Sequence, residues 1–350
     1  MSQEKPRIRW FTPDKPENIS VGRQRIACYL RKAGLSIDVT GTTIKTIHEA
    51  LCERNKYDVI LGTTRAGAIA GTALGQITGK PVIVDHIDPI RQFQETHPRP
   101  LAVPIRLAEN VSFKLADIVF YVYEEECARI SRYADQVVKT DLGVDYKRFA
   151  EPDPEVVDRA DKHLDNLSIR EKVAIYVGGL EPIYHIPEML DAIKKLSEWS
   201  LIIIGDGSLQ EVVIEATKEQ ENIYYIGSVP HMEIPGYLQT ADIGLSLVDD
   251  PHTLKVLEYG AAGLSVVQAE GQAKEKYGDL VEYCDPTEEE IRDAIERAND
   301  RENDHGLKEF AADFDWAEIA KDYYRAIDSV STMECISMDI SEDYSSQTNY

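Results

Sequence analysis

Residues 242–268 read DIGLSLVDDPHTLKVLEYGAAGLSVVQ and join two apolar runs through a polar turn and a helical segment. The two runs, 242–248 and 264–268, are rich in Ile, Leu and Val and have the length of buried strands. The segment between them spaces its apolar residues as a helix does. A strand, a helix and a strand in this order predict a βαβ unit and therefore a parallel sheet.

The turn in this stretch has the residue types that begin a helix. We expect Asp250 to be the N-cap, because its carboxylate can accept backbone N–H bonds. Pro251 suits the first helical position, which needs no N–H donor. The backbone amides of His252, Thr253 and Leu254 would then point out of the helix start, where phosphate oxygens bind.

Lys255 and Glu258 follow on the same helix, three residues apart and on one face. A surface ion pair, worth about a few tenths of a kcal/mol, would account for the two charges alone. It would not account for the small residues 260–263 or for the buried strand that follows. A nucleotide accounts for both, with Lys255 and the helix amides on its diphosphate and Glu258 accepting bonds from the ribose hydroxyls.

The same alternation of strands and helices runs through the whole chain and restarts after a polar segment, which indicates two α/β domains. We expect ligands beyond the carboxyl ends of the strands, in the cleft between the domains. The expected strands are 8–11, 37–40, 57–62, 81–85, 117–122, 137–140, 172–178, 201–205, 223–227, 242–248, 264–268 and 279–284. The expected parts are a first domain (1–150), a linker with a short helix (151–171), a second domain (172–312), a terminal helix (313–330) and a disordered tail (331–350).

Charge and composition exclude some classes of partner. The 38 Lys and Arg residues against 62 Asp and Glu residues give a net charge of −24, a surface that repels nucleic acid. A halophilic source would give such a surface, and contact with anionic lipid would need salt or a basic patch such as Arg7 with Arg9, or 91–99. The sequence shows no membrane span and no secretory signal, and its five cysteines are scattered. We therefore expect a soluble, cytoplasmic protein.

Two further strand ends in the second half carry glycines. Gly205, Asp206 and Gly207 follow one strand, and Gly178 with Gly179 follows another. Glycines let backbone amides approach a ligand closely. Since no third glycine completes a GxGxxG motif, a tight turn is the simpler local interpretation, and ligand binding is the alternative.

The first half offers two candidate sites at strand ends. Gly22 and Arg23 lie between the first strand and its helix, where they either start that helix or reach toward a phosphate or an acceptor. Asp85, His86 and Asp88 end a strand before a long polar loop. His86 is either a hydrogen-bonded residue or a base that orients an acceptor hydroxyl. Both interpretations of each site stay open.

Other chemistries lack their motifs. The sequence has no HExxH, GxSxG or GxxxxGK[ST], which argues against a zinc protease, an α/β-hydrolase and a P-loop enzyme. Its Asp-x-Asp, residues 313–315, opens the terminal helix instead of ending a strand. It is therefore poorly placed to hold a metal–diphosphate.

Six motifs, in order, resemble those of the GT-B glycosyltransferases, most of all the retaining enzymes of family 4. The segment TDLGVDYKRF (140–149) is similar to the signature that closes the family's first domain. FDWAEIA (314–320) is similar to the start of its last helix, which packs back onto that domain. The other four motifs lie at 176–193, 201–213, 223–248 and 251–267.

The resemblance implies an acceptor-side first domain and a second domain that binds a nucleotide-sugar. It implies transfer of a sugar from this co-substrate to an acceptor, with retention and without an essential metal or cofactor. The family's roles fall on Glu258 for the ribose and Lys255 for the diphosphate. They also fall on Asp250 near the donor sugar, on Gly22 in a first-domain glycine loop, and on His86 at the acceptor. Asp250 is one methylene shorter than the usual glutamate.

Two positions depart from the family pattern. Gly179 and Tyr184 stand where the family has an Arg and a Lys that neutralise the departing diphosphate. If the reaction is retained, Lys255 would have to compensate, together with Arg23.

Two other functions stay open beside sugar transfer. A nucleotide-sugar epimerase on the same fold would form product without an acceptor. A catalytically silent subunit would bind a partner, and the absent basic pair is its main support. A glycan or polyprenyl-phosphate-linked acceptor and a place at the inner face of the membrane are compatible with the resemblance, which leaves the donor sugar and oligomeric state open.

Overall fold

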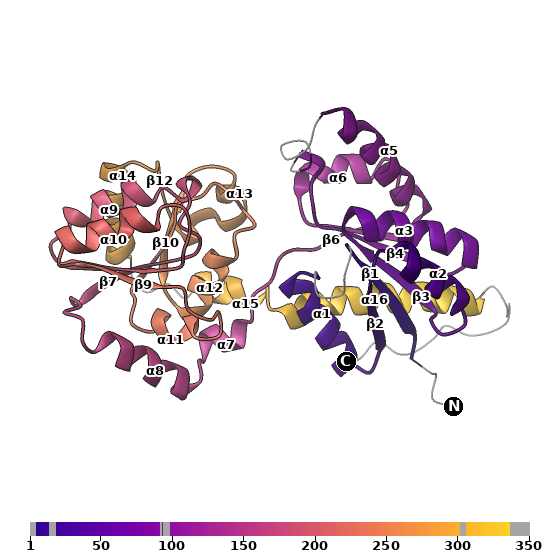
Figure 1. Cartoon of the computed structure of the whole chain (residues 1–350), viewed down its shortest axis with the longest axis horizontal. Coiled ribbons are helices and arrows are strands. Elements are labelled where there is room, and N and C mark those ends of the chain that lie inside the picture. The colour runs from indigo at the N-terminus through magenta and orange to yellow at the C-terminus, as the bar shows by residue number, and fades with distance from the viewer. Residues whose placement is uncertain (1–4, 14–18, 92, 94–98, 302–305, 337–350) are drawn as a thin grey trace. The chain divides into compact units, whose positions relative to one another are not determined.

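The computed structural model of this protein describes residues 5–13, 19–91, 93, 99–301 and 306–336. The chain divides into two compact units (Figure 1). Unit 1 is Met1–Asp141 with Trp316–Tyr350, and unit 2 is Leu142–Asp315. Each unit contains a parallel six-stranded sheet with helices between its strands, which confirms the predicted pair of Rossmann-like α/β domains.

Unit 1 contains the six strands expected in the first half. They are β1 (Arg7–Thr12), β2 (Ser36–Gly41), β3 (Val59–Thr63), β4 (Val82–His86), β5 (Ile118–Tyr121) and β6 (Val137–Lys139). Their order in the sheet is β2-β1-β3-β4-β5-β6. The helices are α1 (Val21–Lys32), α2 (Ile44–Cys52), α3 (Thr64–Thr78), α5 (Arg99–Leu115), α6 (Glu124–Ile130) and α16 (Trp316–Ile336).

Unit 2 contains the six strands expected in the second half. They are β7 (Lys172–Val177), β8 (Trp199–Ile204), β9 (Ile223–Gly227), β10 (Ile243–Ser246), β11 (Ser265–Ala269) and β12 (Glu282–Cys284). Their order in the sheet is β12-β11-β10-β7-β8-β9. The helices are α7 (Tyr146–Ala150), α8 (Pro154–Leu164), α9 (Ile186–Lys194), α10 (Gln210–Glu219), α11 (Ile234–Leu238), α12 (Leu254–Ala262), α13 (Ala273–Tyr277), α14 (Glu288–Asp300) and α15 (Gly306–Ala312).

The inner strands of each sheet are buried because helices cover both of its faces. Every residue of β3, β4 and β8 is buried, as parallel strands with two covered faces require. Two apolar clusters lie in each unit, and the strand side chains divide between the two faces of the sheet. The continuous apolar runs of the sequence therefore reflect a two-sided core.

The last helix, α16, packs on α1 within unit 1. Its residues Tyr323 and Ile327 are fully buried. Its first residue, Trp316, covers Gly22 so closely that a Cβ on Gly22 would lie 2.2 Å from the Trp316 ring. Gly22 therefore has a packing role at the start of α1.

The structure divides the chain at different residues from those predicted. The boundary lies between Asp141 and Leu142, not at 150, because α7 packs against α12 of unit 2. The predicted linker 151–171 has its expected short helix as α8, but this helix packs within unit 2, with Ala160 buried against α11. The helix α16 continues to Ile336, and residues 337–350 of the predicted tail lie outside the described residues.

Within the described ranges, the helices are too short or too polar for a membrane span. In the same ranges, no group of three or more His, Cys, Asp or Glu side chains is arranged to hold a metal ion.

Candidate functional site

The sheet of unit 2 reverses its winding direction between β7 and β10. These strands are parallel neighbours although β8 and β9 separate them in sequence. In doubly wound sheets, ligands bind beyond the carboxyl ends of the strands at such a reversal. Gly178 and Gly179 follow β7, and the segment 249–258 follows β10. The topology therefore brings together the main donor-binding residues predicted from the sequence.

The glycine turns after β7 and β8 are joined by a hydrogen bond. The amide of Leu180 donates to the carbonyl of Asp206 at 2.7 Å, and the Asp206 carboxylate accepts a bond from Ser228 Oγ at 2.6 Å. Gly205 has φ 141°, a conformation that L side chains rarely adopt, and a Cβ there would lie 1.8 Å from the Gly178 carbonyl oxygen. Tight turn packing therefore accounts for Gly205, as the simpler local interpretation predicted.

The helix α12 begins later than predicted. Its N-cap is Thr253 and its first residue is Leu254, so the expected start at Asp250 and Pro251 is wrong. Asp250 Oδ1 accepts a 2.8 Å bond from the His252 amide instead and closes a turn before the helix. The Thr253 side chain makes no cap hydrogen bond, so it does not compete for the first amides of α12.

Lys255 lies in the first turn of α12 between two tyrosine rings. Its Nζ is 4.5 Å from the ring centroid of Tyr176 and 4.3 Å from that of Tyr184. It also donates to the Tyr176 hydroxyl at 3.4 Å. Burial lowers the pKa of Lys255 to about 8, although the negative charge of Glu258 acts to raise it. A charged amine with this pKa beside the carboxyl end of β7 is a candidate anion-binding group.

Glu258 lies one turn further along α12 and is 8% exposed. Its Oε1 is 2.7 Å from Nε2 of His231, whose Nδ1 is 3.1 Å from Nη2 of Arg148. Arginine only donates, so Nδ1 accepts and Nε2–H donates to the carboxylate. Arg148 is in turn 3.1 Å from Asp145. This chain of contacts fixes the orientation of the Glu258 carboxylate.

His231, Arg148 and Tyr176 were missed by the sequence interpretation. His231 belongs to the predicted motif at 223–248, and Arg148 to the one at 140–149, so both lie in segments that carried the resemblance. The one feature of the sequence that could have pointed to them is that each is a polar residue inside a motif of the resemblance. The sequence does not show that α7 lies beside α12, which is what brings Arg148 to the site.

Arg23 is not available to a phosphate or acceptor. It is fully buried in unit 1 and donates to both Asp85 oxygens at 2.8 and 2.9 Å, and to the Tyr323 hydroxyl at 3.1 Å. Thr63 and Tyr323 donate further bonds to the same carboxylate. We therefore correct the predicted donor role of Arg23 and the predicted acceptor role of Asp85 to an internal ion pair.

His86 is 3% exposed and also belongs to a buried polar cluster. Its Nε2 lies 3.2 Å from Glu126 Oε2, and Arg129 contacts the same carboxylate at 2.7 Å. Although burial acts to raise it, the pKa of Glu126 is lowered to about 2, because His86, Arg129 and the Ile90 amide stabilise its charge. The hydrogen-bonded interpretation of His86 therefore fits this geometry better than a base in contact with an acceptor.

Asp88 is more accessible than its neighbours. Its side chain is 33% exposed and lies 3.9 Å from Arg65, which also donates to the Asp88 and Pro89 carbonyls. Arg65 follows Thr64, a β-branched residue with φ 63° that is the first residue of α3. Such strain is kept where the surrounding structure fixes the backbone. Of the predicted acceptor-side residues, Asp88 alone reaches the surface of unit 1.

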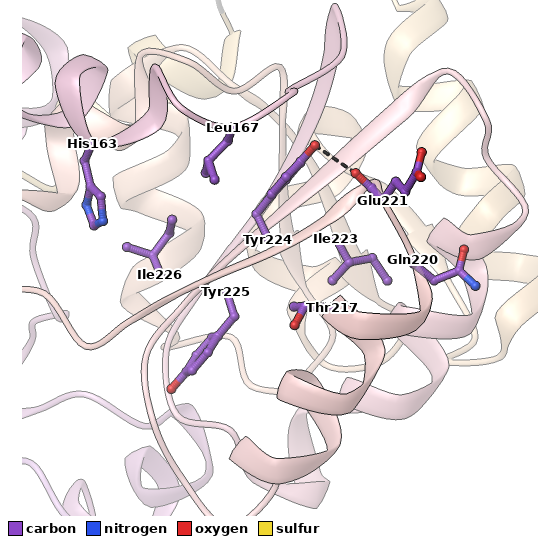
Figure 2. A pocket seen from close by; sticks show the side chains of 9 residues that line it. All are labelled: His163, Leu167, Thr217, Gln220, Glu221, Ile223, Tyr224, Tyr225 and Ile226. Atoms are coloured by element: carbon purple, nitrogen blue, oxygen red, sulfur yellow. Dashed lines mark hydrogen bonds between the residues drawn. The ribbon is translucent and has the colours of Figure 1, made fainter.

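A separate hollow of about 330 Å³ lies along β9 (Figure 2). Tyr224 and Tyr225 lie on its strand side, and His163 of α8 and Thr217 of α10 border it. Tyr225 bonds to the Gly205 carbonyl at 2.9 Å. This hollow lies at the sheet edge, whereas the predicted donor residues lie at the β7–β10 reversal.

Comparison with known proteins gives one family and many structures. Residues 171–300 match the model of the family described as glycosyl transferases group 1. No curated protein sequence matches the chain significantly.

Three solved structures illustrate the likeness of the fold. HepE from Anabaena in complex with UDP and glucose is 16% identical with a TM-score of 0.68, covering 93% of this chain and 100% of that one. A sucrose-phosphate synthase from Thermosynechococcus elongatus is 16% identical with a TM-score of 0.72, covering 94% and 100%. A putative UDP-N-acetylglucosamine 2-epimerase from Listeria monocytogenes is 13% identical with a TM-score of 0.64, covering 98% and 100%.

Proposed function

We propose that this protein is a glycosyltransferase that moves a sugar from a nucleoside-diphosphate sugar to an acceptor, because residues 171–300 match the model of the glycosyl transferases group 1 family and the chain has the GT-B fold. The observation that carries the proposal is the first turn of α12. There Lys255, the uncapped helix start and the oriented Glu258 carboxylate meet at the β7–β10 reversal.

Each group of the candidate site, on α12 or beside it, has one proposed role. Lys255 and the helix amides bind the diphosphate and stabilise the charge that develops as it leaves. Glu258 accepts hydrogen bonds from the ribose hydroxyls, and His231 keeps its carboxylate turned toward them. Asp250 contacts the donor sugar from the turn before the helix. The reaction needs no metal for diphosphate departure in this scheme, and it retains the anomeric configuration.

A UDP-sugar is the first donor to try. The Anabaena protein of like fold is in complex with UDP and glucose. For the acceptor, a lipid-linked or cell-surface glycan precursor remains our proposal, with the protein at the inner face of the membrane. Asp88 is the residue of unit 1 that we assign to acceptor contact, since its carboxylate reaches the surface.

The test measures nucleotide release from UDP-, GDP-, ADP- and dTDP-sugars by the full chain. With the preferred donor, Lys255→Ala should lower turnover about 100-fold or more, because it removes charge stabilisation of the leaving group. Glu258→Ala should raise KM about tenfold by removing a charged acceptor of ribose bonds. Lys218→Ala is the control, since this exposed lysine of α10 pairs only locally with Glu215. Unchanged turnover of Lys255→Ala together with an unchanged KM of Glu258→Ala would reject the site.

An epimerase is the second candidate, because the Listeria structure covers 98% of this chain. Incubation with UDP-N-acetylglucosamine and no acceptor distinguishes the two functions. Epimerisation gives a new UDP-sugar, whereas a transferase without its acceptor gives no product or, by transfer to water, UDP and free N-acetylglucosamine.

A further inference from the structure

The side chain that stands where the resembled family has a lysine contacts Lys255 directly. Tyr184 belongs to the short 3₁₀ turn Pro182–Tyr184 after β7, and its ring centroid lies 4.3 Å from Lys255 Nζ. Tyr176 lies on β7 with its centroid 4.5 Å from the same atom, and the two ring centroids are 6.2 Å apart. The ammonium group therefore lies against two aromatic rings.

The two rings differ in how firmly they are held. Tyr176 is fully buried, and its hydroxyl donates to the Gly179 carbonyl at 2.6 Å. Tyr184 is half-buried on a short turn, where its amide donates to the Glu181 carbonyl at 3.0 Å. The Tyr176 ring thus forms the buried, fixed side of the Lys255 site, and the Tyr184 ring forms the side that borders solvent.

The missing side chain of Gly178 completes this arrangement. A Cβ at Gly178 would lie 3.0 Å from Lys255 Nζ, closer than such contacts ordinarily are. The ammonium thus occupies space at the end of β7 that glycine leaves open. Three segments that meet at the β7–β10 reversal therefore fix one amine: β7, the turn after it and α12.

The positive charge of Lys255 explains why aromatic rings suit the positions beside its ammonium group. A buried ammonium loses hydration, and burial alone favours loss of its proton. The faces of tyrosine rings attract a cation and keep the charged form in a partly dry site. They add no second positive charge that would repel Lys255. An aromatic wall also limits the amine to few orientations, so less freedom is lost when an anion binds.

We propose that Tyr184 is a positioning residue of the donor site, whose ring holds the Lys255 ammonium where it meets the diphosphate. This inference rests on the proposed function and adds to it a reason why a tyrosine can stand at this position. Tyr184 acts through Lys255 and contacts no reacting atom.

A double-mutant cycle in the full chain tests the proposal. Binding of UDP, inorganic pyrophosphate and uridine is measured by titration calorimetry for the wild type, Tyr184→Leu, Lys255→Met and the double variant. Tyr184→Leu should weaken UDP and pyrophosphate binding by about 3- to 30-fold, the range of a cation–π contact. In the Lys255→Met background the same change should have almost no effect, because the partner is gone.

Two controls separate positioning from folding. Tyr184→Phe keeps the ring and should bind within about twofold of the wild type, since the ring face carries the interaction. Uridine lacks the diphosphate, so its affinity should be the same for all variants.

The possible failures are distinguishable. If the wild type binds UDP but Tyr184→Leu binds it equally well, or weakens it equally with and without Lys255, the positioning role is overturned and the proposed function stands. A parallel loss of uridine binding also overturns it, because it indicates general damage to the site. If the wild type binds no nucleoside diphosphate of any base, the proposed function fails together with this inference.

Discussion

At the scale of single residues, the account depends on Lys255. Its amine is partly buried, lies between Tyr176 and Tyr184, and has one carboxylate, that of Glu258, on its own helix face. Burial lowers its pKa to about 8. An exposed lysine would keep its charge throughout the neutral range, whereas this one changes charge just above it.

Binding of a diphosphate should therefore depend on pH in a defined direction. The anion favours protonated Lys255, so the interaction is complete below about pH 7 and is lost as pH rises through the pKa near 8. We expect the affinity for UDP to fall between pH 7 and pH 9. Titration calorimetry across this range provides the measurement.

The matched variant for this experiment is Lys255→Met, which should give a flat profile between pH 7 and pH 9. A wild-type profile that is equally flat would show that Lys255 does not titrate in this range or does not contact the diphosphate.

Residue identity alone could not predict where the other charges lie. Arg23 resembles a surface cation in the sequence, but it pairs with Asp85, 62 residues away, and with Tyr323, 300 residues away. A charged side chain is seldom buried without such partners, and these partners appear only after the sheet and α16 are assembled. The predictions for Lys255 and Glu258 needed only one helix face, so their placement on α12 is confirmed, while their ligands stay a prediction.

At the scale of elements, apolar runs predicted every strand listed above, but they did not predict where α12 begins. The Asp250 carboxylate can cap a helix or close a turn on the amide two residues later, and both use the same atoms. The structure takes the second arrangement and moves the helix start to Leu254. Local sequence does not decide between them, because the difference lies in how the loop after β10 packs.

The contact between α1 and α16 predicts the sign of a change in the free energy of unfolding. Gly22→Ala replaces glycine in the first turn of a helix, a change that stabilises an exposed helix by up to about 1 kcal/mol. Here the new Cβ meets the buried Trp316 ring. We therefore expect the free energy of unfolding to fall by about 1–3 kcal/mol, as for other overpacked sites. Denaturant unfolding followed by tryptophan fluorescence measures it.

The neighbouring Val21→Ala is the control, because Val21 is 68% exposed and should change stability by less than about 0.5 kcal/mol. A Gly22→Ala variant more stable than the wild type would mean that α16 does not press on α1 as described.

At the scale of the whole molecule, the sequence predicts the class of fold well and the division of the chain less well. Strand alternation gives two α/β units because each parallel strand needs a crossover helix. The polar segment 151–171 suggests a linker with a short helix, yet this helix, α8, has one apolar face that packs on α11. The polar composition therefore hides the packing of this helix, which is only half exposed.

The sheet order of unit 2 is the other feature that the sequence does not give. Nothing in the chain order requires β10 to lie beside β7, but this neighbour relation makes one site from segments about 70 residues apart. The hydrogen bond from the β7 residue Val177 to the Tyr259 hydroxyl of α12, at 2.9 Å, ties the same two segments together.

The central claim is that α12 and Lys255 bind the diphosphate of a nucleotide. The most direct measurement is titration calorimetry of the full chain with UDP at pH 7, for the wild type, Lys255→Met and the surface control Lys218→Met. The account predicts that the wild type and Lys218→Met bind alike and that Lys255→Met binds at least tenfold more weakly. Equal affinity of Lys255→Met and the wild type would contradict it.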